Sequence, residues 1–156
     1  MLEYREIIQR LVFHEGLKLY PYKCTQGFWT IGVGRNLQTN PLSKEEQEKI
    51  PNVMAGITKD QAFYLLRNDI ERVIKECVNN FPFFENLDSE RQYCLIDMCF
   101  QLGICKLLKF KKMLSALGVG NYEEAKIQCL DSNYAKQTPK RANRIAECMR
   151  TGHFIV

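Results

Sequence analysis

The spacing of apolar residues predicts that most of this 156-residue chain is helical. Apolar positions at 4, 7, 8, 11 and 12 have the period of a short amphipathic helix, and Gly16 follows as its expected C-terminal cap. After Thr58, apolar residues recur at helical spacing up to position 78, which predicts one long helix of about twenty residues. Thr58 and Gln61 have the spacing of a capping box at its start.

Between these two helices the hydrophobic pattern changes to a period of two. Residues 18–34 alternate, so that Trp29 and Ile31 are expected on one face of a strand and Thr30 on the other. Gly27 marks the turn that precedes this strand. The segment therefore predicts a small antiparallel hairpin sheet.

The pattern beyond residue 80 is helical throughout. Helix starts are expected at Ser89 with Gln92, at Asn121 with Glu124, and at Thr138 followed by Pro139, and the last helix is expected to stop at Gly152. The predicted fold class is α+β, as one domain in two lobes. A small lobe with the hairpin sheet covers about 1–57, a connecting helix covers 58–80, and a larger helical lobe covers 81–156, with a cleft between the lobes as the expected ligand site.

Composition narrows the class of function only slightly. The net charge of +4 is a mild excess, which would favour nucleic acid, anionic lipid or bacterial wall without choosing among them. Seven cysteines, an odd number without a CxxC pair, argue against a disulfide scaffold, and most of them fit helical patterns as small buried hydrophobes. Only two histidines are present, so neither a metal nor a cofactor is expected.

The first thirteen residues, MLEYREIIQRLVF, contain four charged side chains and no long apolar run. We therefore expect neither a signal peptide nor a membrane anchor, and a protein that accumulates in the cytoplasm. Candidate chemistry follows in HEGLKLYPYKCTQGFWTIGVG, where a carboxylate, a thiol and a hydroxyl have the spacing E(x)8C(x)5T. These residues are Glu15, Cys24 and Thr30.

Those three residues and the segments around them resemble the phage-type lysozymes, the endolysin family. The stretch just quoted matches the family's EGL, Y-K, G and TIG-G signature, and Cys24 lies within its pattern, which allows Asp or Cys. Further matches follow in the family's order, and they are ITKDQA, MCFQLG, NYEEAKIQ, QTPKRANR and RTG. The likeness covers almost the whole chain.

This resemblance implies hydrolysis of the β-1,4 bond between N-acetylmuramic acid and N-acetylglucosamine in bacterial peptidoglycan. It implies Glu15 as the general acid and Thr30 as the residue that holds the attacking water, with inversion at the anomeric carbon. Cys24 stands in place of the commoner Asp, and a thiol has a pKa of about 8.5 against about 3.9 for Asp. We expect Cys24 to activate or orient the water, with Lys23 as a possible cation beside its thiolate, although an inert residue in the cleft is the alternative.

The resemblance also assigns residues of the helical lobe to substrate binding. Phe100 and Gln101 match positions that line the saccharide cleft, although the spacing of Phe100 fits core packing equally. Arg141 matches an arginine that reaches towards the catalytic glutamate, and Gln137 is expected beside it. Four cleft positions depart from the family pattern and leave the preferred wall chemistry open, and they are Arg35, Asn36, Met113 and Gln128.

Three other functions fit parts of the sequence. A protein of the same fold could bind peptidoglycan without cutting it, as the missing Asp would suggest. Basic runs at 106–112 and 140–144 could bind nucleic acid or a membrane, but such runs are more often solvated helix faces. A Cys–His hydrolase built on Cys24 and His14 would need an orienting third residue. The preferred interpretation is a monomeric endolysin held in the host bacterial cytoplasm until it is released to the cell wall.

Overall fold

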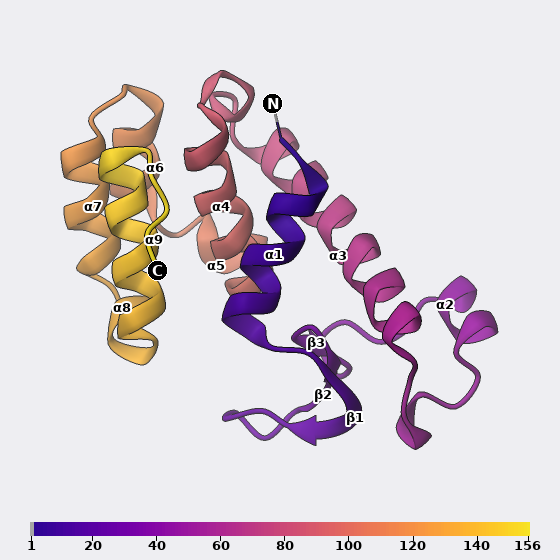
Figure 1. Ribbon diagram of the computed structural model, residues 1–156. Coiled ribbons are helices and arrows are strands. Elements are labelled where there is room, and N and C mark those ends of the chain that lie inside the picture. The colour runs from indigo at the N-terminus through magenta and orange to yellow at the C-terminus, as the bar shows by residue number, and fades with distance from the viewer. Residues whose placement is uncertain (1) are drawn as a thin grey trace. The chain divides into compact units, whose positions relative to one another are not determined.

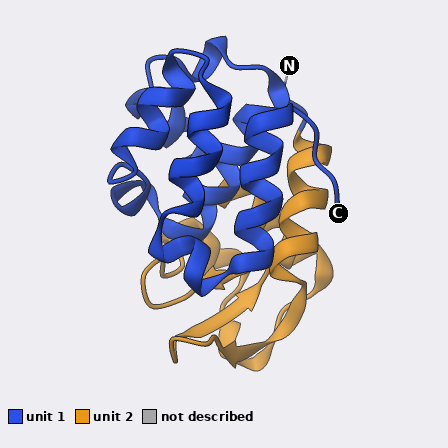
Figure 2. Ribbon diagram, turned by 90° about the vertical axis from the view of Figure 1, so that its left-hand side faces the viewer, with its two compact units in different colours: residues 1–3, 72–156 blue, residues 4–71 orange. Residues whose placement is uncertain are grey.

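The computed structural model describes residues 2–156, and it divides the chain into two compact units (Figure 2). The N-terminal unit is Tyr4–Glu71, and the C-terminal unit is residues 1–3 together with Arg72–Val156. The boundary falls inside the long helix α3, Lys59–Asn80 (Figure 1). The fold is mostly helical with one small antiparallel sheet, as the predicted α+β class requires.

Helix α1, Tyr4–Glu15, opens the N-terminal unit and buries Ile7 and Leu11. It ends as predicted, because Gly16 has a positive φ of 77° and its amide donates to the carbonyl of Val12 at 2.8 Å. This cap fixes where the chain leaves the helix, and Glu15 is the last helical residue.

Three short antiparallel strands follow in the order β1-β2-β3, and they are β1 Lys18–Lys23, β2 Trp29–Gly32 and β3 Arg35–Asn36. The expected alternation along β2 is wrong at one point. Trp29 is 44% exposed, whereas Thr30 and Ile31 are both buried. Trp29 is the first residue of β2, next to the turn, whereas the strand is buried from Thr30 to Gly32.

The core of this unit is packed around Ile31 of the sheet and Leu65 of α3, with Ile50, Ile57 and Ala62. Along the chain, the sheet is followed by α2, Lys44–Lys49, and the 3-10 turn η1, Val53–Ala55, before α3 begins. The capping box predicted for α3 is confirmed. The amide of Gln61 donates to the Thr58 hydroxyl at 3.1 Å, and the amide of Thr58 donates to the Gln61 side chain at 2.9 Å.

A buried ion cluster joins β3, α2 and α3. The Arg35 guanidinium donates to both carboxylate oxygens of Glu46, at 2.7 and 3.1 Å, and lies 3.2 Å from Asp69. All three side chains are at least 95% buried. Burial raises the pKa of Glu46, but hydrogen bonds from Arg35, Asn68 and the Ser43 amide outweigh it and lower the pKa to about 2. Arg35, expected in the cleft, is therefore an internal structural residue, because its charge is fully paired.

The C-terminal unit consists of helices joined by short turns (Figure 1). Its elements are η2 Phe84–Asn86, α4 Ser89–Leu102, α5 Ile104–Leu107, α6 Lys111–Gly118, α7 Tyr122–Leu130, α8 Asn133–Gln137 and α9 Pro139–Thr151. Helix α4 is the central one, since every residue from 92 to 99 is buried. Helix α7 packs against both α6 and α9, and α9 also packs against α4.

The predicted helix ends of this unit are largely confirmed. The Asn121 side chain accepts from the amide of Glu124, and α9 ends at Gly152 with a left-handed φ of 77°. The expected cap of α4 lies one residue too late. Asp88, not Ser89, is the N-cap, and its carboxylate accepts from the amide of Arg91 at 3.3 Å. Aspartate and serine cap about equally well, so their order in the sequence does not decide between them.

All seven cysteines are among the described residues and are free thiols. Five are buried as expected, but Cys105 is exposed because it lies in the short helix α5 at the surface of its unit. Over residues 2–156, no helix combines the length and the apolar character that crossing a membrane requires. The same residues contain no cluster of three histidine, cysteine, aspartate or glutamate side chains placed to hold a metal ion.

Candidate active site

Glu15, Cys24 and Thr30 all lie in the N-terminal unit. Glu15 ends α1, Cys24 follows directly after β1, and Thr30 is the second residue of β2. The hairpin joins the last two, because Tyr22 pairs with Thr30 across the strands and Lys23 pairs with Trp29. Residues two apart on a strand face the same side, so Tyr22, Cys24 and Thr30 share one face of the hairpin.

Tyr22 connects Glu15 to this group. The pKa of Tyr22 is raised, first by burial and then by the negative charges of Glu15 and Cys24. The charges of Glu15 and Cys24 therefore both act on the Tyr22 phenol. Tyr22 was not among the residues predicted for the site. The signal was its position in LYPYKC, two residues before Cys24 on the same strand face.

The Cys24 sulfur lies at the turn between β1 and β2. Partial burial raises the pKa of this thiol, but backbone hydrogen bonds at Phe28 and Gln26 and a hydrogen bond with Thr30 outweigh it, and the pKa is lowered. The turn itself is closed by two bonds, from the Cys24 amide to the Phe28 carbonyl at 2.9 Å and from the Gly27 amide to the Cys24 carbonyl at 2.8 Å. The turn therefore makes Cys24 a stronger acid than an ordinary thiol.

Lys23 does not have the role expected for it. Its ammonium lies 5.3 Å from the centre of the Trp29 ring, in a cation–π arrangement. Cys24 is stabilised by backbone and hydroxyl groups instead of by a neighbouring cation. The sequence could not show this, because the stabilising amides belong to the backbone and depend on how the turn folds.

The Thr30 hydroxyl has two partners. It donates to the carbonyl of Phe28 at 3.0 Å, and it also interacts with the Cys24 sulfur. A hydroxyl has one proton and two lone pairs, so while it donates to Phe28 its oxygen can accept a hydrogen bond from water. Its single proton is shared between the Phe28 carbonyl and the Cys24 sulfur, and its oxygen keeps the capacity to accept a hydrogen bond.

Glu15 packs against the turn between β2 and β3. A Cβ atom added to Gly34 would lie 2.6 Å from the Glu15 Oε2 atom, and Gly34 has a positive φ of 64°. Only glycine tolerates both conditions, so Gly34 provides the surface on which the carboxylate rests. The turn and the close approach to the carboxylate therefore occur at the same position.

The four residues expected to bind substrate lie in the C-terminal unit. Gln101, on α4, donates to the Thr138 hydroxyl at 3.3 Å, and Thr138 directly precedes α9, which carries Arg141. The Arg141 Nε atom donates to Asp97 at 2.9 Å, and both side chains are more than 90% buried. The expected approach of Arg141 to Glu15 would join the two units and stays a prediction.

Phe100 and Gln137 complete this set. Phe100 is half-buried on α4, as either of its expected roles allows, and Gln137 is exposed at the end of α8. The buried Oε1 atom of Gln101 has no hydrogen-bond partner among the described residues, and an unsatisfied buried acceptor of this kind suits a ligand that brings a donor. Gln101 and Thr138 are joined by a hydrogen bond, and Arg141 is joined to Asp97.

Comparison with known proteins shows the family of the chain. The sequence profile of the phage lysozyme family matches residues 12–146, which include Glu15, Cys24, Thr30 and Arg141. The chain belongs to the phage lysozyme family.

Relatives of the chain include a protein of Dictyostelium discoideum named "Probable T4-type lysozyme 2", which is 34% identical over 91% of this chain and 92% of its own length. An endolysin of Acyrthosiphon pisum secondary endosymbiont phage 1 is 29% identical over 82% of this chain and 77% of its own length. The pre-baseplate central spike protein of Enterobacteria phage T4 is 32% identical over 90% of this chain, which spans 27% of that longer protein.

Membership of the phage lysozyme family supports a lysozyme-like glycosidase with peptidoglycan as its substrate. Family membership does not support the alternative of a Cys–His hydrolase built on Cys24 and His14. His14 is on α1 with its ring 5.3 Å from that of Phe13, and Cys24 interacts instead with Thr30 and the backbone of its own turn.

Proposed function

We propose that the protein is a lysozyme that hydrolyses the β-1,4 bond between N-acetylmuramic acid and N-acetylglucosamine in peptidoglycan. One observation carries the proposal. The charges of Glu15 and Cys24 both raise the pKa of the Tyr22 phenol, and the pKa of Cys24 is itself lowered. The Thr30 hydroxyl, which can orient water, lies beside the Cys24 thiol. Cleavage of a glycosidic bond requires an acid for the leaving oxygen and a second group for the attacking water.

The reaction proceeds in one displacement. Glu15 donates its proton to the glycosidic oxygen as that bond breaks and positive charge develops on the sugar ring. Water, held by the Thr30 oxygen, adds to the anomeric carbon from the opposite face and gives a proton to the Cys24 thiolate. The configuration inverts, and the glutamate and the thiol exchange protons with solvent before the next cycle.

Tyr22 assists both groups. The phenol keeps its proton at neutral pH, as its raised pKa favours, and would act as a hydrogen-bond donor next to two groups that become anionic. The same proposal gives substrate contacts to Phe100, Gln101, Gln137 and Arg141 in the C-terminal unit.

A second candidate is a protein that binds peptidoglycan without cleaving it. The thiol at position 24 favours this candidate, since a thiol is a weaker source of negative charge than the Asp found in other members of the family. The lowered pKa of Cys24 and the retention of Glu15 favour the enzyme.

The deciding experiment measures reducing sugar ends released from purified peptidoglycan. The wild type, Glu15→Gln and Cys24→Ala proteins are compared, each with and without thiol alkylation. We expect activity in the wild type and a loss of at least about a hundredfold in Glu15→Gln. Alkylation should lower the activity of the wild type but should not lower that of Cys24→Ala any further. Wall binding by all three proteins with no reducing ends from any of them would establish the binding protein instead.

We also propose that the enzyme acts on a bacterial host from inside. It would accumulate in the cytoplasm and reach the wall once the membrane has been permeabilised. Fractionation of expressing bacteria before and after membrane permeabilisation tests this step, because wall release should follow permeabilisation and not precede it.

A further inference from the structure

The hairpin of β1 and β2 (Figure 1) belongs to the N-terminal unit and exposes aromatic side chains. Tyr20 is 72% exposed and Trp29 is 44% exposed. Large aromatic side chains usually bury most of their surface in folded proteins. The reaction proposed above uses neither residue, so their exposure needs another explanation.

Trp29 lies on the hairpin face opposite the candidate catalytic group. It pairs with Lys23 across the strands, whereas Tyr22 pairs with Thr30, and adjacent residues of a strand point to opposite faces. Ile31, two residues after Trp29, shares its face and is buried in the core of the unit. Trp29 and Lys23 therefore lie at the end of this face that the core leaves uncovered.

A second exposed group lies along β1, which is an edge strand of the sheet. The Tyr20 ring rests on the backbone of Gly56, where an added Cβ atom would lie 2.9 Å from the ring atom Cε1. Met54, two residues before this glycine, is 50% exposed. The amide of Ile57 donates to the carbonyl of Leu19 at 2.8 Å and holds this segment against β1. The hairpin and the segment beside it thus both expose apolar side chains.

The exposed charges of the hairpin are positive. Residues 16–43 contain no aspartate or glutamate. Lys18 and Lys23 are exposed, and their ammonium groups lie 5.2 Å from the centre of the Tyr22 ring and 5.3 Å from that of Trp29. An anionic partner therefore meets cations held beside aromatic rings and no repelling carboxylate on this segment. We call the set of exposed side chains the hairpin surface, and it consists of Lys18, Tyr20, Lys23, Trp29 and Met54.

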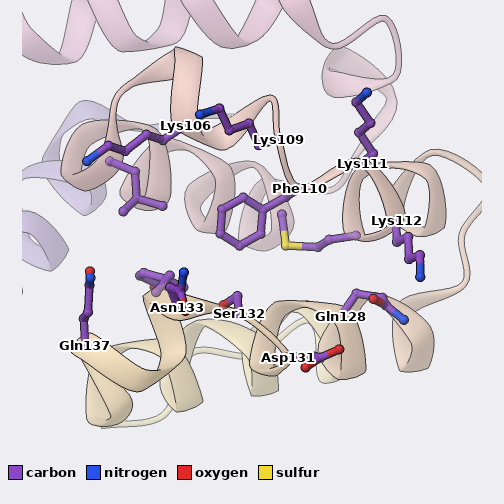
Figure 3. Close-up of a pocket in the computed structure, with 13 residues that line it drawn as sticks. Lys106, Lys109, Phe110, Lys111, Lys112, Gln128, Asp131, Ser132, Asn133 and Gln137 are labelled. Atoms are coloured by element: carbon purple, nitrogen blue, oxygen red, sulfur yellow. The ribbon is translucent and has the colours of Figure 1, made fainter.

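The basic run at 106–112 lies in a different setting. It lines a groove of about 630 Å³ in the C-terminal unit (Figure 3). Gln137, which is predicted to bind substrate, also lines that groove, so the groove belongs to the site already described. Phe110 of the basic run is half-buried and packs edge-on against Tyr134, with ring centres 6.2 Å apart. The hairpin surface, in contrast, combines lysines with open aromatic rings.

We propose that the hairpin surface binds a membrane of anionic phospholipid. Tryptophan and tyrosine favour the boundary between lipid headgroups and acyl chains, because one end of each side chain is apolar and the other is polar. Lysines beside them are attracted to the negative surface of the bilayer. The contact is peripheral, since the rings and the methionine enter the headgroup region while the two ammonium groups remain at the phosphates. This inference goes beyond the proposed hydrolysis and does not depend on it.

A lipid surface fits the hairpin surface better than nucleic acid. Proteins that bind nucleic acid neutralise several phosphates with a track of cations along the backbone. Lys18 and Lys23 provide only a short stretch of charge. A bilayer requires less charge, because the aromatic and apolar side chains contribute their own share of the binding by entering the headgroup region.

The test uses tryptophan fluorescence. The chain has one tryptophan, so its emission reports on Trp29 and on the hairpin surface alone. The wild-type protein is titrated at low salt with vesicles of phosphatidylglycerol and, separately, of phosphatidylcholine. The double change Lys18→Gln/Lys23→Gln is compared with Lys75→Gln/Lys140→Gln, which removes the same charge from exposed positions of the C-terminal unit. Thermal unfolding of each variant confirms that it folds.

We expect the emission of the wild type to move to shorter wavelength with phosphatidylglycerol and to stay unchanged with phosphatidylcholine. The double change in the hairpin should weaken binding to phosphatidylglycerol by at least about fivefold, since one lysine near an anionic surface contributes about that factor. The control pair should change it by less than about twofold. The difference should shrink as salt rises to about 1 M.

An unchanged emission with both kinds of vesicle overturns the proposal, and so does an equal loss of binding in the two double variants. The Glu15→Gln protein is also mixed with purified peptidoglycan and with single-stranded DNA. A shift with either of these and none with vesicles overturns the proposal and assigns the hairpin surface to that polymer. The proposed reaction is judged separately, by the reducing ends that the wild type releases.

Discussion

The carboxylate of Glu15 rests on the backbone of Gly34, so close that a Cβ atom at position 34 would lie 2.6 Å from the Glu15 Oε2 atom. The two residues belong to the same unit, one at the end of α1 and the other in the turn before β3. The orientation of the acid therefore depends on the absence of a side chain at a position well beyond it in the chain.

Gly34→Ala should lower activity much more than it lowers stability. The added methyl group displaces the carboxylate, because the tip of a glutamate moves more easily than the backbone, and a displaced acid costs about tenfold or more in kcat. The positive φ of 64° adds about 1 kcal/mol of strain to the folded state. Release of reducing ends and denaturant unfolding measure the two effects.

Gly120→Ala is the matched control. Gly120 has a φ of 77° with open space where a Cβ atom would lie, and it belongs to the other unit. The same strain should appear there without any loss of activity. Equal activity losses in the two variants would show that backbone strain, and not displacement of Glu15, is responsible.

Cys24→Asp should move the acidic side of the pH–activity profile to lower pH. The group that accepts the proton from water must be ionised, so activity rises as it loses its own proton. The pKa of Cys24 is lowered by its turn, but from an ordinary value of 9.0, whereas a carboxylate is ionised from about pH 4. The profile of kcat/KM between about pH 4 and pH 9 measures the change, and identical profiles would mean that Cys24 accepts no proton.

Cys24 should also be the fastest of the partly or fully buried thiols to react with iodoacetamide, because thiolate is the reactive form. Burial raises the pKa of Cys129 to about 12, and a hydrogen bond with Cys99, followed by burial, raises that of Cys77 further. Peptide mass spectrometry in a Cys105→Ser background, which removes the exposed thiol, gives the order of reaction. Labelling of Cys129 as early as Cys24 would contradict the expected thiolate at position 24.

Glu46 should make the fold sensitive to acid. Its pKa is about 2 in the folded protein and 4.5 ordinarily, so the folded state binds the proton less readily than the unfolded chain. The resulting stability, about 3 kcal/mol, is fully present above pH 4.5 and is lost as the pH falls towards 2. Urea unfolding at several pH values should show this loss in the wild type and a much smaller one in Glu46→Gln. The same dependence of unfolding free energy on pH in both proteins would show that Glu46 does not cause the acid sensitivity.

The helices could be predicted because their signals are local. The Thr58–Gln61 capping box and the Gly16 cap each depend on residues a few positions apart, and both are present as expected. The exposure of Trp29 could not be predicted in the same way. It depends on which segments pack over each residue of the strand, because Trp29 is exposed and Ile31 is buried on the same strand.

The candidate site shows the same division. The spacing of Glu15, Cys24 and Thr30 is a sequence pattern, and the structure brings these residues together around Tyr22. The cause of the lowered Cys24 pKa could not be predicted from side chains, because most of the hydrogen bonds that lower it come from the backbone of the turn. The role of Arg35 was also hidden, since its partners Glu46 and Asp69 lie on other elements further along the chain.

The Arg35 cluster limits how this chain can change over evolutionary time. Glu46 both closes the capping box of α2 and pairs with Arg35, so one substitution there removes a helix cap and leaves an arginine short of a partner. Replacing Arg35 alone would leave two carboxylates together in the interior. Viable homologues should therefore change positions 35, 46 and 69 as a set, and an engineered library that varies them one at a time should return folded proteins of lowered stability.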